Sequence, residues 1–177
     1  MKQIVLLRGI NIGSRNRIAM PKLRELFMSA GFQEVSTYLQ SGNAVLHSDA
    51  SAGELAGECE RLIAGELGLD IAIVARTRDE LAKVVQSNPL GEVAVDPKRY
   101  QVTFCSQKPA AALVRKLAER AAPSEQFAAV GRELYAWHPD GVGRSKLASQ
   151  IGGKGLGVTA TARNWTTVTK LLELADQ

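Results

Sequence analysis

Short apolar runs and amphipathic stretches alternate along the whole chain. Ile4 to Leu7 is an unbroken apolar run, which is typical of a central strand that is buried on both faces. From Glu34 to Gln40 apolar and polar residues alternate, as they do in a half-buried strand. Between these two strands, Leu23, Leu26 and Phe27 recur at helical spacing. The pattern therefore predicts that strands and amphipathic helices follow one another in sequence.

The same periodicities predict the order β-α-β-β-α-β-α in each half of the chain. In the first half we expect strands at 2–8, 34–40, 43–47 and 70–75, and helices that begin near 21, 51 and 77. In the second half we expect strands at 99–105, 125–129, 133–138 and 158–161, and helices that begin near 110, 145 and 164. Ser51 with Glu54, and Thr77 with Glu80, have the spacing of capping boxes at helix starts.

The first six elements of each half match the split β-α-β, or ferredoxin-like, unit. We therefore predict an α+β fold of duplicated ferredoxin-like repeats, with antiparallel sheets and helices on one face. The repeats should span 1–90 and 98–177, with 91–97 as a connector. A right-handed crossover makes the first two strands of a unit parallel, with the third strand antiparallel between them. Arg8 and Asn11 should then lie beside the hairpin turn at Ser41 and Asn43.

Composition is that of an ordinary globular protein. Of 177 residues, 45% are apolar and 23% are charged. The apolar runs are far shorter than the roughly 20 residues of a membrane helix, and the N-terminus does not resemble a signal peptide. Cys59 and Cys105 lack metal or redox spacing. We therefore expect a cytoplasmic protein without a bound metal, and no cofactor is indicated.

Charge is distributed unevenly, although the net charge is only +4. Residues 1–24 contain six basic side chains and no acidic one, whereas residues 49–70 contain six acids against a single arginine. Residues 98–177 contain twelve basic and six acidic residues. The basic stretches coincide with loops rich in glycine and asparagine, where an anion can be held.

Four separated motifs carry a family resemblance that spans nearly the whole chain. They are Leu-Arg-Gly-Ile-Asn-Ile-Gly at 7–13, Thr-Tyr-Leu-Gln-Ser-Gly-Asn at 37–43, Arg-Ser-Lys-Leu at 144–147 and Ala-Arg-Asn-Trp-Thr-Thr-Val-Thr-Lys-Leu at 162–171. In these four motifs the sequence resembles the bacterial domain-of-unknown-function 1697 family. It departs from the family at 12–14, where Ile-Gly-Ser replaces a valine and a second glycine. The resemblance implies two ferredoxin-like repeats, and it implies no activity and no catalytic residues.

The loop after the first strand is the most unusual segment for function. It lies between a strand and a helix and contains Gly9 and Gly13, but it lacks the G-x-G-x-x-G spacing and the Lys-Ser/Thr of nucleotide-binding loops. Its glycines and asparagines are also explained by left-handed backbone conformations alone. The functional alternative is that helix N–H groups together with Arg8, Arg15 and Arg17 bind phosphate or carboxylate.

The leading hypothesis is a binding protein for an anionic, phosphate-bearing ligand, either a nucleotide or nucleic acid. Arg8 and Arg163 would make charge-assisted contacts, and Asn11, Ser41, Asn43, Ser145 and Asn164 would orient the ligand. Arg144, Ser145 and Lys146 would form a second anion site with Arg163 and Asn164. Capping of a helix by Ser145 explains that motif equally well.

Two other classes of function stay open. One is a cofactor-independent enzyme on a small anionic substrate, with Tyr38 or Lys146 as the acid or base. The other is a protein-interaction module whose polar motifs hold the repeats together. A Ser-His hydrolase at Ser41 is disfavoured, because neither His47 nor His138 has an evident route to it. The sequence does not determine the ligand or the oligomeric state.

Overall fold

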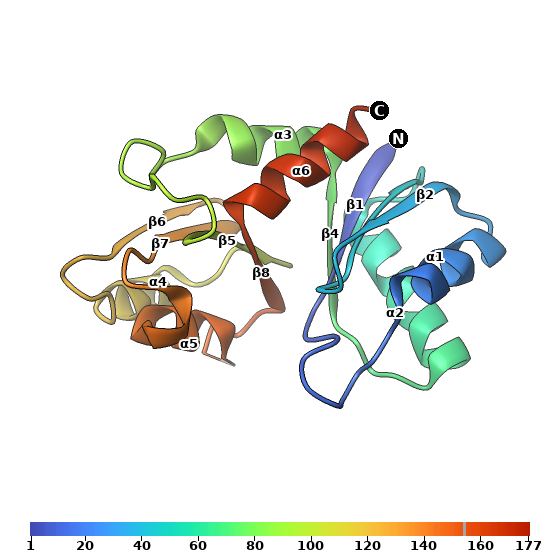
Figure 1. Ribbon diagram of the computed structural model, residues 1–177, viewed down its shortest axis with the longest axis horizontal. Helices are drawn as coiled ribbons and strands as arrows, with labels where there is room; N and C mark the ends of the chain where they lie inside the picture. Colours follow the sequence, from blue (N-terminus) through green and yellow to red (C-terminus); the bar gives the residue numbers. More distant parts are fainter. Residues whose placement is uncertain (154) are drawn as a thin grey trace. The chain divides into compact units, whose positions relative to one another are not determined.

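The computed structural model describes residues 1–153 and 155–177 (Figure 1). The chain forms two compact units. The first comprises Met1–Lys83 together with Lys170–Gln177, and the second comprises Val84–Thr169. The repeats predicted from the sequence are defined by the order of elements along the chain, whereas these units are defined by spatial contacts. The repeat limits therefore stay a prediction.

Each unit contains one four-stranded sheet. The elements from the first half are β1 (Lys2–Leu7), α1 (Met20–Ser29), β2 (Gln33–Tyr38), β3 (Asn43–His47), α2 (Ala52–Leu67), β4 (Ile73–Thr77) and α3 (Arg78–Ser87). Those from the second half are β5 (Tyr100–Cys105), α4 (Ala111–Ala118), β6 (Gln126–Val130), β7 (Glu133–Trp137), the 3-10 turn η1 (Val142–Arg144), α5 (Lys146–Gly152), β8 (Ala160–Asn164) and α6 (Trp165–Ala175).

The two sheets have the same topology. Their strand orders are β2-β3-β1-β4 and β6-β7-β5-β8, and every neighbouring pair is antiparallel. β1 is therefore parallel to β2, with β3 between them, and β5 is parallel to β6, with β7 between them. This is the arrangement predicted from a right-handed crossover. This arrangement confirms the predicted α+β fold of duplicated ferredoxin-like repeats.

In the first unit, α1 and α2 pack on one face of the sheet. Leu23 and Phe27 of α1 join Cys59 of α2 in a core whose sheet residues include Val5 and Leu7. Alternation along β1 places these two side chains on the same face, because successive strand residues point in opposite directions. The second unit repeats the arrangement. Its helix-covered core contains Leu117 of α4, Leu147 and Ile151 of α5, and Cys105, Leu134 and Ala136 of the sheet.

Two strands lie further along the chain than the periodicity predicted. β4 covers Ile73–Thr77 rather than 70–75, and β8 covers Ala160–Asn164 rather than 158–161. Each is an edge strand whose limits are set by its partner: β4 pairs with β1 from Ile73 to Thr77, and β8 pairs with β5 up to Asn164. The hydrogen-bonded ladder, rather than the apolar pattern of the strand itself, decides these boundaries.

None of the helices within the described residues has the length and apolarity that crossing a bilayer requires.

Candidate functional site

The loop from Arg8 to Ile18 is anchored by one asparagine side chain. The Asn11 amide donates to the carbonyl oxygens of Ile18, at 2.8 Å, and of Gln40, at 2.7 Å. Its own oxygen accepts from the Ile18 N–H at 2.9 Å. The side chain thus closes the base of the loop and ties it to the hairpin turn. The proximity of Asn11 to this turn, expected from the topology, is confirmed.

The loop backbone is built from left-handed conformations. Asn11, Gly13 and Asn16 have φ values of 55°, 68° and 53°, a region that glycine and asparagine tolerate best. The Asn11 N–H donates to the Asn16 carbonyl at 3.0 Å, and Ile12 and Arg15 form an antiparallel bridge. The loop is therefore a small closed hairpin with a defined shape.

The loop carries two exposed cations and one exposed aliphatic side chain. Arg15 and Arg17 are both exposed, and Ile12 is 74% exposed. No acidic residue occurs between Met1 and Arg24, so the chain supplies no counter-charge from its own neighbourhood in sequence. Arg8, at the base of the loop, is half-buried, and its main-chain N–H donates to the Ala72 carbonyl.

The β2–β3 turn supports the base of the loop. Asn43 is fully buried, and its amide donates to the Tyr38 carbonyl at 2.7 Å and to the Ser41 hydroxyl at 3.0 Å. Gly42 has a φ of 90°, and a Cβ there would lie 2.6 Å from the Ile10 side chain. Asn43 thus shapes the turn from the inside, whereas Ser41 is exposed.

In the second unit, the Arg144–Lys146 motif is organised by a buried carboxylate. Glu125 lies before β6, and its Oε2 accepts from the Ser145 hydroxyl at 2.5 Å and contacts His138 Nδ1 at 2.5 Å. Its Oε1 accepts from the Ala122 N–H at 2.9 Å. The side chains of His138 and Glu125 are only 1% and 5% exposed. One carboxylate therefore joins the start of β6, the end of β7 and the start of α5.

The environment of Glu125 keeps it ionised. Burial by itself raises the pKa of this carboxyl, but hydrogen bonds from Ser145, the Ala122 N–H and His138 outweigh it, so the pKa is lowered below its usual value. Ser145 also accepts from the Ala148 N–H at 3.0 Å, as a helix N-cap. Its hydroxyl is thus used as both donor and acceptor.

The other predicted residues of this unit differ in their environments. Arg144 is exposed, and Lys146 is exposed as well. Asn164 accepts from the Thr167 N–H at 2.9 Å and caps α6, as the sequence suggested. Arg163 and Asn164 are adjacent in β8 and so point to opposite faces of the sheet. Pairing with Val102 places Arg163 on the face away from α4 and α5, whereas Ser145 caps α5.

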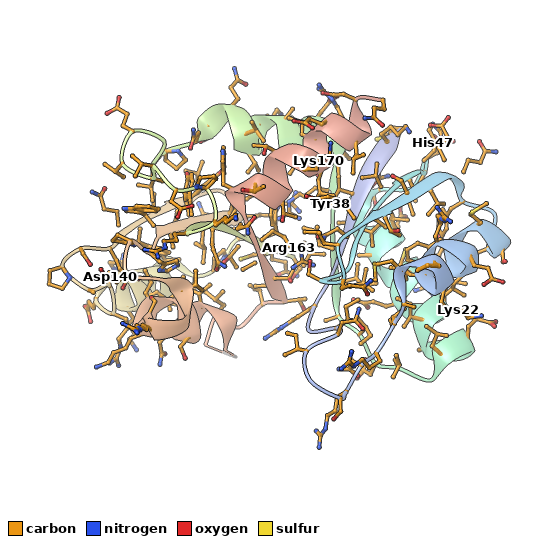
Figure 2. The ribbon with its side chains drawn as sticks, viewed as in Figure 1. Lys22, Tyr38, His47, Asp140, Arg163 and Lys170 are labelled. Carbon is orange, nitrogen blue, oxygen red and sulfur yellow. The ribbon has the colours of Figure 1, made fainter. Side chains whose placement is uncertain are left out.

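Arg163 is a buried cation (Figure 2). Its guanidinium donates to the Thr161 hydroxyl at 2.7 Å and to the Ala162 carbonyl at 2.8 Å, and burial lowers its pKa to about 10. Arg76 occupies the corresponding place in β4, is 1% exposed and donates to the Ala75 carbonyl. The equivalence of these two arginines was not predicted, although Ala-Arg followed by a polar residue occurs in both strands.

Glu125 and His138 were also missed as partners of Ser145. Their separation in sequence is 13 residues, and Ser145 lies 20 residues from Glu125. Only the β6–β7 hairpin, which the sequence did predict, brings the start of one strand and the end of the next together. Once that hairpin is predicted, Glu125 just before β6 and His138 just after β7 are expected to be neighbours. Their pairing could therefore have been predicted from the sequence.

Packing within the fold holds Trp165 and both cysteines. Trp165 stacks on buried Tyr100, with ring centroids 4.8 Å apart, so it anchors the start of α6. Cys59 and Cys105 are buried, and burial beside Glu58 and Glu60 raises the pKa of Cys59 to about 12. Within residues 1–153 and 155–177, no group of three or more histidine, cysteine or carboxylate side chains could hold a metal ion.

Comparison with known proteins is consistent with this architecture. Residues 1–135 match the family described as "Protein of unknown function (DUF1697)". The structure of conserved bacterial protein SP0830 from Streptococcus pneumoniae is similar over 98% of both chains, with a TM-score of 0.77 and 18% identity, which shows a shared fold. No curated protein matches the sequence. The family match extends over most of the chain, and the protein therefore belongs to the DUF1697 family.

Proposed function

We propose that this protein binds nucleic acid through the loop of residues 8–18. One observation carries the proposal: a hydrogen-bonded hairpin presents exposed Arg15 beside its turn and is followed by exposed Arg17, within a stretch that contains no acid. Fixed cations gain more from a phosphate than mobile ones do, because less side-chain and loop entropy is lost on binding. The anchoring by Asn11 supplies this preorganisation.

The proposal divides the predicted site residues into two roles. Arg8, Arg15 and Arg17 supply positive charge, and Asn11, Ser41 and Asn43 hold the loop and the turn in shape. In the second unit, Arg144 and Lys146 are exposed cations, whereas Ser145 and Asn164 act as helix caps. The asparagines that the sequence suggested as ligand contacts are thus proposed as positioning residues.

A polymer suits this geometry better than a free nucleotide. Arg15 lies beside the turn of the hairpin and Arg17 follows the hairpin, and both side chains are exposed to solvent. A single phosphate there would be only weakly held, whereas a strand of nucleic acid offers successive phosphates and gains from the release of its counterions.

Fluorescence anisotropy with a labelled single strand of about 20 nucleotides, as RNA and as DNA, tests the proposal. Affinity should fall steeply between about 50 and 300 mM salt, and the double variant Arg15→Ala/Arg17→Ala should reduce the slope of log K against log salt by about 1.4, or about 0.7 for each lost phosphate contact. Arg115→Ala/Arg120→Ala removes two exposed cations elsewhere and is the matched control. Salt-independent binding, or equal slopes for both double variants, would refute the proposal.

A second candidate is a purely structural role for the polar motifs, within each unit rather than between the repeats. It is favoured by the internal hydrogen bonds of Asn11, Asn43 and Ser145, all of which end on groups of the same unit. In that case the motifs stabilise the fold and the arginines at 15 and 17 contribute nothing to ligand binding. Absence of nucleic-acid binding together with strong destabilisation by asparagine variants would favour this candidate.

A further inference from the structure

Four strands form the edges of the two sheets, and they differ in how they are protected. β2 has a register shift between Gln33 and Ser36, and within it Glu34 has a φ of 52° and forms an ion pair with Lys2. Bulges and charges of this kind prevent an edge from pairing with another chain. Most residues of β4 and β8, the edges on the other side, are buried.

β6 lacks all of these protections. Its sequence, Gln-Phe-Ala-Ala-Val, contains no charge and no proline, and it pairs with β7 in a continuous register without a shift. Ala129 is exposed, and Val130 is 43% exposed. A regular, uncharged, accessible edge is a template for strand addition.

The register shows which backbone groups are available. Val130 and Glu133 are paired across the two-residue turn at Gly131 and Arg132, so they form a hydrogen-bonded pair, and such pairs alternate with non-bonded ones. Phe127 and Ala129 therefore point their N–H and C=O groups away from β7. In the part of the chain that the structure describes, no strand lies beyond β6 to bond them.

A groove runs along this edge, between β6 and α4. The apolar side chains that line it belong to Pro109, Ala111, Val114 and Ala129, and the charged ones to Lys108 and Arg115. No acid is among the described residues that line it. Phe127 and Ala129 share the helix-facing side of β6, because they pair with Ala136 and Leu134 of the helix-covered core. Alternate side chains of an added strand would project over the same groove.

We propose that the β6 edge and its groove bind an extended, acidic peptide segment of a partner protein by strand addition. Main-chain hydrogen bonds to Phe127 and Ala129 would hold the peptide, small apolar side chains would fill the groove, and flanking carboxylates would meet Lys108 and Arg115. A second copy of β6 fits less well, because antiparallel self-pairing would bring the same two cations of both copies to one seam. This surface is independent of the loop at 8–18.

The test uses the full chain and a synthetic peptide with alternating threonine and valine at its centre and glutamates at each end. It should bind saturably below about 1 mM, and its N-methylated form, which lacks central backbone donors, should not bind. Lys108→Glu/Arg115→Glu should weaken binding by about tenfold or more and improve binding of a lysine-flanked peptide. The control Lys116→Glu/Arg120→Glu changes exposed cations outside the groove lining and should alter affinity by less than about threefold.

Amide hydrogen exchange provides a second readout that does not depend on any variant folding. Peptide binding should slow exchange of the outward N–H groups of Phe127 and Ala129 and leave Ala128, which already faces β7, unchanged. Equal binding of the N-methylated peptide, indifference to the charge reversal, or protection elsewhere would overturn the proposal. A concentration-dependent dimer that Ala129→Pro abolishes would assign the edge to a second copy and also overturn it.

Discussion

Two asparagine side chains show how differently the same residue type contributes to this fold. Asn43 is fully buried and bonds the Tyr38 carbonyl and the Ser41 hydroxyl, whereas Asn164 is partly exposed and caps α6 through Thr167. Loss of a buried donor leaves its acceptor unsatisfied, at a cost of about 1–3 kcal/mol. Loss of a cap costs about 1 kcal/mol.

We therefore expect Asn43→Ala to lower the melting temperature more than Asn164→Ala does. For a chain of this length, about 1 kcal/mol corresponds to roughly 2–4 °C. Differential scanning calorimetry of the two variants against the native chain measures the difference. If Asn43→Ala melts at the same temperature as the native protein, the buried amide makes no net contribution to stability. A ligand-binding role for Asn43 then regains support.

Glu125 should make the stability of the protein sensitive to acid. Its pKa in the folded chain is below its usual value, so its contribution is present above the unfolded-state pKa and is lost as pH falls through the folded-state pKa. Glu125→Gln should cost about 1–3 kcal/mol near neutral pH, because the charge-assisted hydrogen bonds are weakened. As pH falls through the folded-state pKa, the variant and the native chain should converge.

Urea unfolding of both proteins at several pH values from about 3 to 7 follows this convergence. Ser124→Ala is a suitable control, since Ser124 donates to Asp140 in the neighbouring exposed turn (Figure 2) and leaves Glu125 untouched. A constant difference between Glu125→Gln and the native chain across the whole range would mean that ionisation of Glu125 is not linked to folding.

At the level of elements, the loop of residues 8–18 depends on Asn11 in two separable ways. Asn11→Ala removes the side-chain hydrogen bonds to Ile18 and Gln40 and places a residue with a Cβ but no polar side chain at a φ of 55°. Asn11→Gly removes the bonds but tolerates the conformation. Both variants should show faster amide exchange at Ile18. The Asn11→Ala variant should be less stable than the Asn11→Gly variant by about 1 kcal/mol.

The same pair of variants links the loop to the proposed function. Nucleic-acid affinity should fall in both, although every arginine is retained, because the cations lose their fixed geometry. Anisotropy measured at one salt concentration, with Arg115→Ala/Arg120→Ala as reference, gives the comparison. Unchanged affinity in Asn11→Gly would show that preorganisation of the loop is not needed.

Local sequence signals predicted most elements, because their causes are local. Both capping boxes form as expected: Ser51 bonds Glu54, and Thr77 bonds Glu80 in each direction. The β6–β7 hairpin is also present, with Gly131 at a φ of 59°. These features rest on contacts within a few residues, which periodicity and turn chemistry describe well.

Features that depend on distant contacts were harder to predict. Glu125 and His138 become partners only through the hairpin, and the side of the sheet to which Arg163 points is decided by its register with β5. A basic residue in a strand gives no sign of whether it is exposed or buried. For the candidate site, the sequence predicted which loops carry unusual residues, but it did not predict that asparagine side chains would bond internally.

On the scale of the whole molecule, the end of the chain belongs to the unit that its beginning forms. Lys170–Gln177, which comprises the second part of α6 and the two residues after it, belongs to the first unit. Within that unit Leu171 and Ala175 are buried, and Asp176 accepts from Arg78 at 2.7 Å. The duplicated topology was predictable from element order, whereas this membership depends on contacts such as that between Arg78 and Asp176, which are 98 positions apart.

Deletion of residues 170–177 should therefore destabilise the first unit. The loss of the buried Leu171 side chain alone should cost about 2–5 kcal/mol. Hydrogen exchange should accelerate in β1 and β4, which belong to that unit. Asp176→Asn is the control, because it removes only a partly exposed ion pair, worth about 0–1 kcal/mol. Unaltered exchange in β1 after the deletion would show that the segment is dispensable.

This membership has a consequence for biosynthesis. A nascent chain emerges from the ribosome in order, so the segment up to Lys83 is available long before the residues that complete its unit. The first unit therefore stays incomplete until residues 170–177 have been translated. Chaperone dependence of this chain should accordingly be decided in the interval between synthesis of β4 and synthesis of the last turns of α6.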